Sequence, residues 1–188
     1  MGNLLKEEKL TPRYEGLKVT REEYLDLYDD GFKYDMVEGV LHMSPSPFYE
    51  HGKVQNKFGH LIQTYLDKSP IGEVVTEVDV LLPDGQDVFR PDITFILNEN
   101  LHIVKKHIHG SPDLICEILS DSTRARDLGV KADRYLKNGV KEYWIIDPDN
   151  KTSELWVNNQ TNWIKSDEDS LESNLLKGFK IKVNEVFT

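Results

Sequence analysis

The 188-residue sequence has little cysteine, no long apolar run and no excess of positive charge. Its single cysteine, Cys116, excludes an internal disulfide and every zinc motif that needs several cysteines. No apolar stretch approaches the roughly 18 residues that a membrane-spanning helix needs, so we expect no membrane span. Residues 1–15 mix charges and lack the apolar core of a secretion signal, which favours the cytoplasm.

The formal net charge of −10 has the wrong sign for a nonspecific nucleic-acid binder, whose affinity comes largely from neutralising phosphates. It does not exclude a nuclease, because bound cations reverse the electrostatic field at a carboxylate site. The composition, with 38% hydrophobic and 30% charged residues, is typical of a globular protein of one domain. We expect an N-terminal arm over residues 1–17 and a single domain over residues 18–188.

The spacing of apolar residues predicts an α/β domain with a mixed central β-sheet flanked by helices. Thr20 and Glu23 form a capping box that opens a short helix ending at Gly31, and a hairpin follows with Glu38 and Gly39 at its turn. Longer helices are predicted from about residue 51 to 68 and over residues 124–137, and a turn over residues 83–86. Strands are predicted over residues 73–82, 88–97, 113–119, 142–146, 154–157, 163–165 and 179–183.

Asp92 and Glu117 are each the lone acid inside a short apolar strand-like run. A buried carboxylate costs several kcal/mol, roughly, unless it is paired or bound to a metal. If the two strands are adjacent, a Mg²⁺ or Mn²⁺ ion would relieve the repulsion between the acids. The alternative pairs each acid with a lysine or arginine, and Arg90 is a candidate partner because it shares a strand face with Asp92.

The predicted helix over residues 124–137 carries Asp127, Lys131 and Tyr135 on one stripe. If this helix packs beside the strand of Glu117, Lys131 can reach the carboxylates and stabilise charge on a phosphoryl group. The alternative is a surface pair between Asp127 and Lys131, worth a few tenths of a kcal/mol.

Other candidate residues favour structural roles. Cys116 is expected in the core, Asp113 is interpreted as structural, and Asp147 belongs to a turn that ends a strand. A loose histidine cluster lacks the spacing of a zinc site, and it comprises His102, His107 and His109.

Several motifs occur in the order in which they occur in one known family. They are residues 34–39 (YDMVEG), a Ser-Pro-Ser-Pro loop, His51, residues 90–93 (RPDI), 111–120 (SPDLICEILS), 131–135 (KADRY) and 139–148 (GVKEYWIIDP). Over roughly residues 20–165 the sequence resembles the Uma family of restriction endonucleases. That family belongs to the PD-(D/E)XK nuclease superfamily, which implies a restriction-endonuclease-like fold.

The resemblance assigns Asp92 as the superfamily's first acid and Glu117 as the second, and Ile118 would offer its main-chain carbonyl to the metal. The superfamily's lysine should stand two residues after the glutamate, but that position is Leu119. Lys131 on the following helix could replace it. Glu38 matches the acid that the superfamily often supplies from outside the strand pair, although a plain turn residue is the alternative. His51 would contact phosphate or orient Glu38, or would be a surface histidine at a helix start.

The resemblance implies a Mg²⁺-dependent endonuclease, with Mn²⁺ as a possible substitute, that hydrolyses DNA phosphodiester bonds through a metal-activated water. A homodimer is expected, because nucleases of this fold often pair to cut both strands. Two alternatives stay open. One is a catalytically inactive nuclease-fold module that binds nucleic acid or protein, and the other is a metal-dependent hydrolase of a small phosphorylated substrate.

Overall fold

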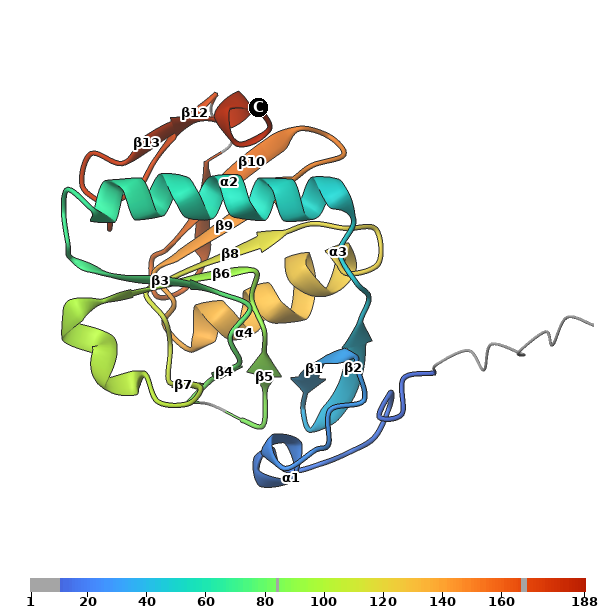
Figure 1. Ribbon diagram of the computed structural model, residues 1–188. Coiled ribbons are helices and arrows are strands. Elements are labelled where there is room, and N and C mark those ends of the chain that lie inside the picture. Colours follow the sequence, from blue (N-terminus) through green and yellow to red (C-terminus); the bar gives the residue numbers. More distant parts are fainter. Residues whose placement is uncertain (1–10, 84, 167–168) are drawn as a thin grey trace, which may run out of the picture.

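A computed structural model describes residues 11–83, 85–166 and 169–188 (Figure 1). Its centre is a six-stranded sheet in which only β8 and β9 are parallel to each other, so the predicted mixed sheet is confirmed. In spatial order the strands are β11 (Trp163–Ser166), β10 (Thr152–Asn158), β9 (Glu142–Asp147), β8 (Leu114–Ile118), β6 (Ile93–Leu97) and β3 (Gly72–Thr76).

A second sheet of five short strands lies beside the first. Its spatial order is β2 (Val40–Ser44), β1 (Lys33–Val37), β5 (Val88–Phe89), β4 (Val80–Leu81) and β7 (Ile108–His109). β1 and β2 form the predicted hairpin, and its turn residues Glu38 and Gly39 have φ angles of 50° and 80°. Two further strands, β12 (Ser170–Glu172) and β13 (Lys180–Lys182), pair near the C-terminus, where a strand over residues 179–183 was predicted.

Two of the predicted strands were wrong in extent, because the chain leaves one sheet for the other within each of them. The run 73–82 divides into β3 and β4, and Glu77 between them has a φ angle of 54°. The run 88–97 divides into β5 and β6 at Pro91, whose ring removes the backbone donor that a continuous ladder needs. The turn predicted over residues 83–86 lies partly outside the described residues.

The helices begin where the sequence predicts. Helix α1 (Arg21–Leu25) has the complete Thr20–Glu23 capping box, but it ends at Leu25 and not at Gly31. Helix α2 (Tyr49–Leu66) is the long helix expected from residue 51. The predicted helix over residues 124–137 is built from α3 (Arg124–Arg126), the π-helical turn η2 (Asp127–Lys131) and α4 (Ala132–Lys137). Two 3₁₀ segments, η1 (Asn98–Ile103) and η3 (Val183–Val186), complete the order.

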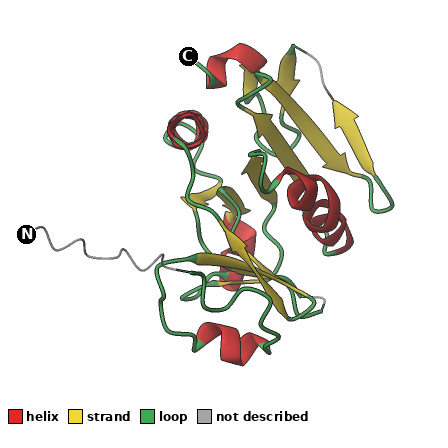
Figure 2. Ribbon diagram, turned by 90° about the vertical axis from the view of Figure 1, so that its right-hand side faces the viewer, coloured by secondary structure: helices red, strands yellow, loops and turns green. Residues whose placement is uncertain are grey.

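Helices cover both faces of the six-stranded sheet. In Figure 1, α2 runs above β6, β8 and β9, and the α3–α4 helix lies below them. One apolar cluster joins Phe58 and Ile62 of α2 to Trp144 of β9, and a second joins Tyr135 of α4 to Ile115 of β8. Figure 2 shows that α1 packs at the end of the molecule opposite to the C-terminus. Successive residues of β8 point to opposite faces of the sheet, so Cys116 packs in the cluster under α2 and Ile115 in the cluster under α4. Glu117 is two residues after Ile115 and therefore points to the same face as Ile115, toward α4.

The segment that precedes α1 is attached to the hairpin. Gly16 donates to the carbonyl of Leu41 at 2.8 Å, and Leu41 donates back to Leu17 at 2.9 Å. Residues 1–10 of the predicted arm lie outside the described residues, so its boundary at residue 17 stays a prediction. Within the described part of the chain, no helix is both long and apolar enough to cross a membrane.

Candidate functional site

The structure brings Asp92 and Glu117 together at the edge where β6 and β8 pair. The two strands are antiparallel, with Ile93 opposite Cys116, so the residue before β6 faces Glu117. The main-chain N–H of Ile118 donates to Asp92 Oδ2 at 2.7 Å, and the N–H of Asp92 donates to Glu117 Oε2 at 3.4 Å. Asp92 therefore does not lie within a strand, as the sequence suggested, but its backbone and carboxylate are fixed against β8.

Arg90, the alternative partner of Asp92, binds elsewhere. Its guanidinium forms an ion pair with Asp79, with Nε 2.6 Å from Oδ1 and Nη2 3.1 Å from Oδ2. The predicted pairing of Arg90 with Asp92 required both residues to lie on one continuous strand. The chain is not a strand between Phe89 and Ile93, so the two residues do not share a strand face.

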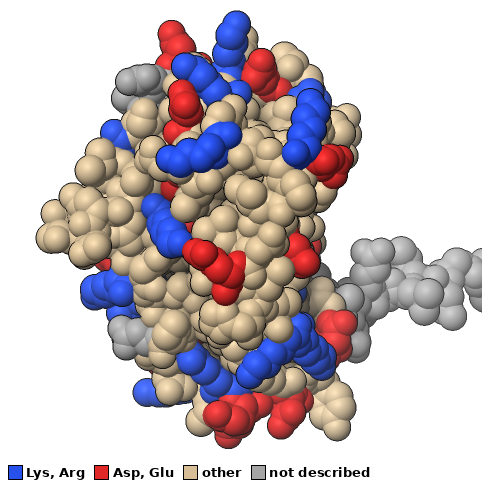
Figure 3. Space-filling model, turned by 90° about the vertical axis from the view of Figure 1, so that its left-hand side faces the viewer, with Lys and Arg blue, Asp and Glu red and all other residues tan. Residues whose placement is uncertain are grey.

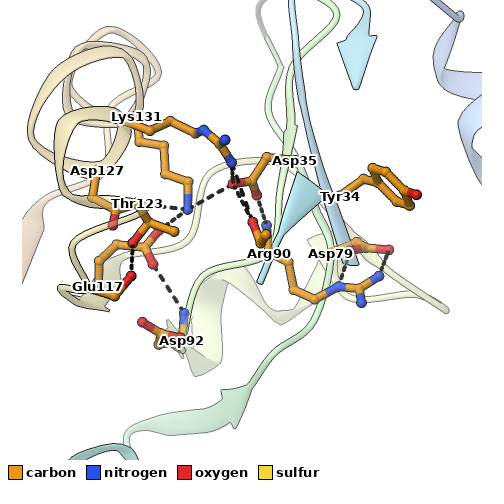
Figure 4. A network of polar contacts seen from close by, with 12 residues as sticks. Tyr34, Asp35, Asp79, Arg90, Asp92, Glu117, Thr123, Asp127 and Lys131 are labelled. Carbon is orange, nitrogen blue, oxygen red and sulfur yellow. Dashed lines mark hydrogen bonds and ion pairs between the residues drawn. The ribbon is translucent and has the colours of Figure 1, made fainter. Parts of the chain in front are cut away.

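Lys131 reaches the carboxylates from the helix below the sheet (Figure 4). Its Nζ lies 3.0 Å from Glu117 Oε1, 3.1 Å from Asp127 Oδ1 and 3.3 Å from Asp35 Oδ2. Only 4% of the residue is exposed, so the alternative of a surface pair is wrong. Burial lowers the pKa of Lys131, but the three carboxylates outweigh it and raise the pKa well above its ordinary value. The lysine is therefore a fixed positive charge.

The helix is locally widened where it supplies this lysine. Residues Asp127–Lys131 form a π-helical turn, a rare geometry that is frequently found at functional sites. One turn further, Tyr135 donates its hydroxyl proton to Glu117 Oε1 at 2.9 Å. The same glutamate oxygen thus accepts from both Lys131 and Tyr135, which fixes the rotamer of Glu117.

The acids at this site outnumber the cations that touch them. Burial, together with the nearby charges of Asp127, Asp92 and Asp35, raises the pKa of Glu117 well above its ordinary value, while Lys131 acts in the opposite direction. Four carboxylates surround the site, and they are Asp35, Asp92, Glu117 and Asp127. The cations that contact them are Lys131, Arg126 and, when protonated, His51. A divalent cation would offset this excess of acid, so the donor set fits Mg²⁺ or Mn²⁺.

The predicted ligand set contains only two acidic side chains, and the third ligand is the carbonyl of Ile118. Consistent with this, no group of three or more His, Cys, Asp or Glu side chains in the described part of the chain is arranged to hold a metal. The ligand roles of Asp92, Glu117 and Ile118 therefore stay predictions, supported by the position of all three at one pocket.

Glu38 does not lie at this site. Its side chain is 74% exposed at the hairpin turn, where it pairs with Arg134. The acid that reaches the site from the hairpin is Asp35, which is 2% exposed and contacts both Lys131 and Arg126. Asp35 was not predicted as a site residue, although an acid between Tyr34 and Met36 of a largely apolar strand was a visible signal.

His51 belongs to the site but does not contact Glu38. Its Nε2 lies 3.3 Å from Asp92 Oδ2. Burial lowers the pKa of His51, but the hydrogen bond and charge of Asp92 and the charge of Glu77 raise it overall. The prediction that His51 orients Glu38 is therefore wrong, and the carboxylate that His51 contacts is that of Asp92.

These residues line one pocket between the hairpin, the start of α2 and the β6–β8 edge. Its wall also includes Lys33, Tyr34, the loop Ser44–Phe48, Glu77, Arg90, Ser120, Ser122 and Thr123. Asp113, Asp147 and the histidine cluster lie outside its lining. Asp113 pairs with Lys141, and Asp147 binds Arg124, which holds the pKa of Asp147 down to about 2 against the effect of burial.

Comparisons with known proteins agree with this arrangement. The model of the family Uma2, described as "Putative restriction endonuclease", matches residues 21–184. A solved structure described as a putative nuclease belonging to DUF820, from Anabaena variabilis, superposes with a TM-score of 0.77. The two chains are 19% identical over 90% of this chain and 97% of the other, so the likeness shows the restriction-endonuclease-like fold. No curated protein matches the sequence.

Proposed function

The chain belongs to the Uma2 family, and from that membership we propose that it is a magnesium-dependent endonuclease that hydrolyses DNA phosphodiester bonds. One observation supports this proposal most directly. Two carboxylates, Asp92 directly before β6 and Glu117 on the adjacent strand β8, share a pocket with the buried ammonium of Lys131. Acids that hold a divalent cation beside a fixed positive charge are the arrangement that phosphodiester hydrolysis needs.

Each residue has a separate task in this proposal. Asp92, Glu117 and the carbonyl of Ile118 would hold the cation, which when bound neutralises phosphate charge and lowers the pKa of a water molecule. Lys131 places its ammonium beside the phosphate and stabilises the negative charge that develops there. Asp35 and Asp127 hold Lys131 in place, and His51 orients Asp92. Because these groups are fixed by hydrogen bonds before substrate binds, little reorganisation is required.

The test combines cleavage with metal binding. Wild type and Asp92→Asn are incubated with a supercoiled plasmid and with a single-stranded circular DNA in Mg²⁺, Mn²⁺ or EDTA, and Mg²⁺ binding is measured by calorimetry. Asparagine keeps an oxygen that can accept from Ile118 but removes the charge. We expect a loss of cleavage of about 100-fold or more, with weaker Mg²⁺ binding. Glu73→Gln, an exposed acid on β3, removes the same charge and should cleave like wild type.

The outcomes separate the alternatives. Metal binding by the wild type without cleavage of either DNA would contradict the proposed endonuclease activity but would still support the proposed metal site. Turnover of bis(p-nitrophenyl) phosphate without DNA cleavage would instead support the hydrolase of a small substrate. If the wild type binds neither Mg²⁺ nor Mn²⁺, both the metal site and the hydrolase are excluded.

A further inference from the structure

Phe48 is an exposed aromatic side chain on the wall of the pocket that contains Asp92 and Glu117. It is 84% exposed, and it is the N-cap residue of α2. His51 follows three residues later and places its Nε2 3.3 Å from Asp92 Oδ2. Phe48 and His51 both line the pocket, so an exposed apolar ring shares its wall with the histidine that contacts a candidate metal ligand.

The ring is presented by a constrained loop. Pro45 and Pro47 precede Phe48, and proline fixes the backbone φ angle. Ser44 at the start of the loop accepts a hydrogen bond from Arg126 at 3.4 Å, which connects the loop to the acid cluster through Asp35. A loop whose backbone is already constrained loses less conformational freedom when a ligand stacks on a residue that it carries.

The cations of the pocket are already paired with acids. The lysine and arginine residues among the described lining are Lys33, Arg90 and Lys131. Lys33 pairs with Glu77, Arg90 pairs with Asp79, and Lys131 pairs with three carboxylates. Neutralisation of phosphates, the main source of affinity for duplex DNA, is therefore weak at this pocket. Stacking on an aromatic ring supplies affinity that does not depend on such charges.

From these observations we propose that Phe48 is a stacking platform for an unpaired base next to the phosphate that is cut. The site then takes single-stranded DNA, or a single-stranded part of a larger DNA, in preference to continuous duplex. In a duplex the faces of each base are covered by its neighbours, so a ring at the rim gains a contact only with a base that is out of the stack. This inference rests on the proposed function, because it names the substrate class of the same pocket.

The experiment measures binding and not cleavage, in Ca²⁺ buffer, by fluorescence anisotropy of a labelled oligonucleotide as a single strand and as a duplex of the same sequence. We expect wild type to bind the single strand at least about tenfold more tightly. Phe48→Ala should weaken that binding by about 5- to 150-fold, the range for loss of one base–aromatic stack, and leave duplex binding unchanged. Tyr28→Ala is the matched control, because Tyr28 is also 84% exposed but lies outside the lining of this pocket.

Two further variants separate stacking from simple apolar contact. Phe48→Trp keeps an aromatic face and should bind like wild type, whereas Phe48→Leu keeps apolar bulk only and should bind like Phe48→Ala. Equal binding of the single strand by wild type and Phe48→Ala, wild-type binding by Phe48→Leu, or a wild-type preference for duplex would each overturn the inference. Failure of the proposed hydrolysis would instead appear as absence of cleavage with this binding pattern intact.

Discussion

Asp35 and Glu38 lie three residues apart on one hairpin, and their side chains have opposite surroundings. Asp35 is on β1, where it is buried and contacts Lys131 and Arg126. Glu38 is at the turn and points into solvent toward Arg134. The pKa of Asp35 is lowered, since the charges of Lys131 and Arg126 outweigh the effect of burial. Asp35 therefore remains ionised at neutral pH and holds the lysine by charge.

This contrast gives a prediction for a matched pair of variants. Asp35→Asn should reduce DNA cleavage by about tenfold or more, because Lys131 loses one of the charges that position it. Glu38→Gln should stay within about twofold of wild type, because its carboxylate pairs only at the surface. The rates are measured on the same DNA, with thermal unfolding to show that both variants are folded. A comparable loss of cleavage rate in both variants would contradict this prediction and would show that Glu38 contributes to the site.

The residue scale also shows what sequence can and cannot predict about the site. Asp92 and Glu117 could be predicted because each is an acid among apolar residues. For Lys131 the helical stripe also allowed a surface pair with Asp127, and the resemblance to the Uma family assigned it to the site. The choice between Asp35 and Glu38 depends on which residue occupies the turn, where φ is 50°, and a shift of one position in the turn changes which acid faces inward. The order of the motifs along the sequence does not indicate which residue occupies the turn of the hairpin.

At the scale of elements, β3 needs a glycine at its first residue. A Cβ built on Gly72 would lie 2.3 Å from the carbonyl oxygen of Ile96 and 2.7 Å from the ring of Phe95. Both neighbours belong to β6, the strand that follows directly after Asp92. The close approach of β3 therefore supports the element that positions a candidate ligand.

We expect Gly72→Ala to lower the free energy of unfolding by about 1–3 kcal/mol, the usual cost of overpacking. Gly59→Ala is the control, since a Cβ on Gly59 in α2 meets nothing within 4 Å. Alanine there should raise the free energy of unfolding by about 0.5–1 kcal/mol, because it restricts the unfolded chain and favours the helix. Urea titrations followed by circular dichroism measure both. A stable Gly72→Ala protein would show that β3 and β6 can separate without cost.

Elements with a long apolar period were predicted well, and short ones were not. Helix α2 and the buried strands β8 and β9 each carry a pattern that only one structure satisfies. The two-residue strands β4, β5 and β7 are too short to produce a period, so the strands that extend the predicted hairpin into a second sheet could not be predicted. The π-helical turn also left no signal, since Asp127 and Lys131 have the spacing of an ordinary helix.

At the scale of the whole molecule, negative charge dominates, because the sequence has 33 acidic and 23 basic residues. On the face shown in Figure 3, groups of lysine and arginine lie beside acidic side chains, with uncharged surface between them. The net charge is −10. The mixed sheet itself was predictable, because a helix between β8 and β9 is the usual connection between parallel strands. The distribution of charge over the surface could not be predicted, because it depends on which residues the two sheets bring together.

This distribution predicts a weak dependence of DNA binding on salt. Each phosphate that a protein neutralises in a single strand contributes a slope of about −0.7 to the logarithm of the binding constant against the logarithm of salt. Because the pocket's cations are paired with acids, we expect a total slope smaller than about 2 in magnitude. Lys33 is the most exposed of them, so Lys33→Gln should reduce the slope by less than about 1. The measurement is the anisotropy titration at several NaCl concentrations with Ca²⁺ fixed. A slope of about 5 or more would require a basic surface beyond the residues that line the pocket, and DNA would then be held mainly by its backbone and not by its bases.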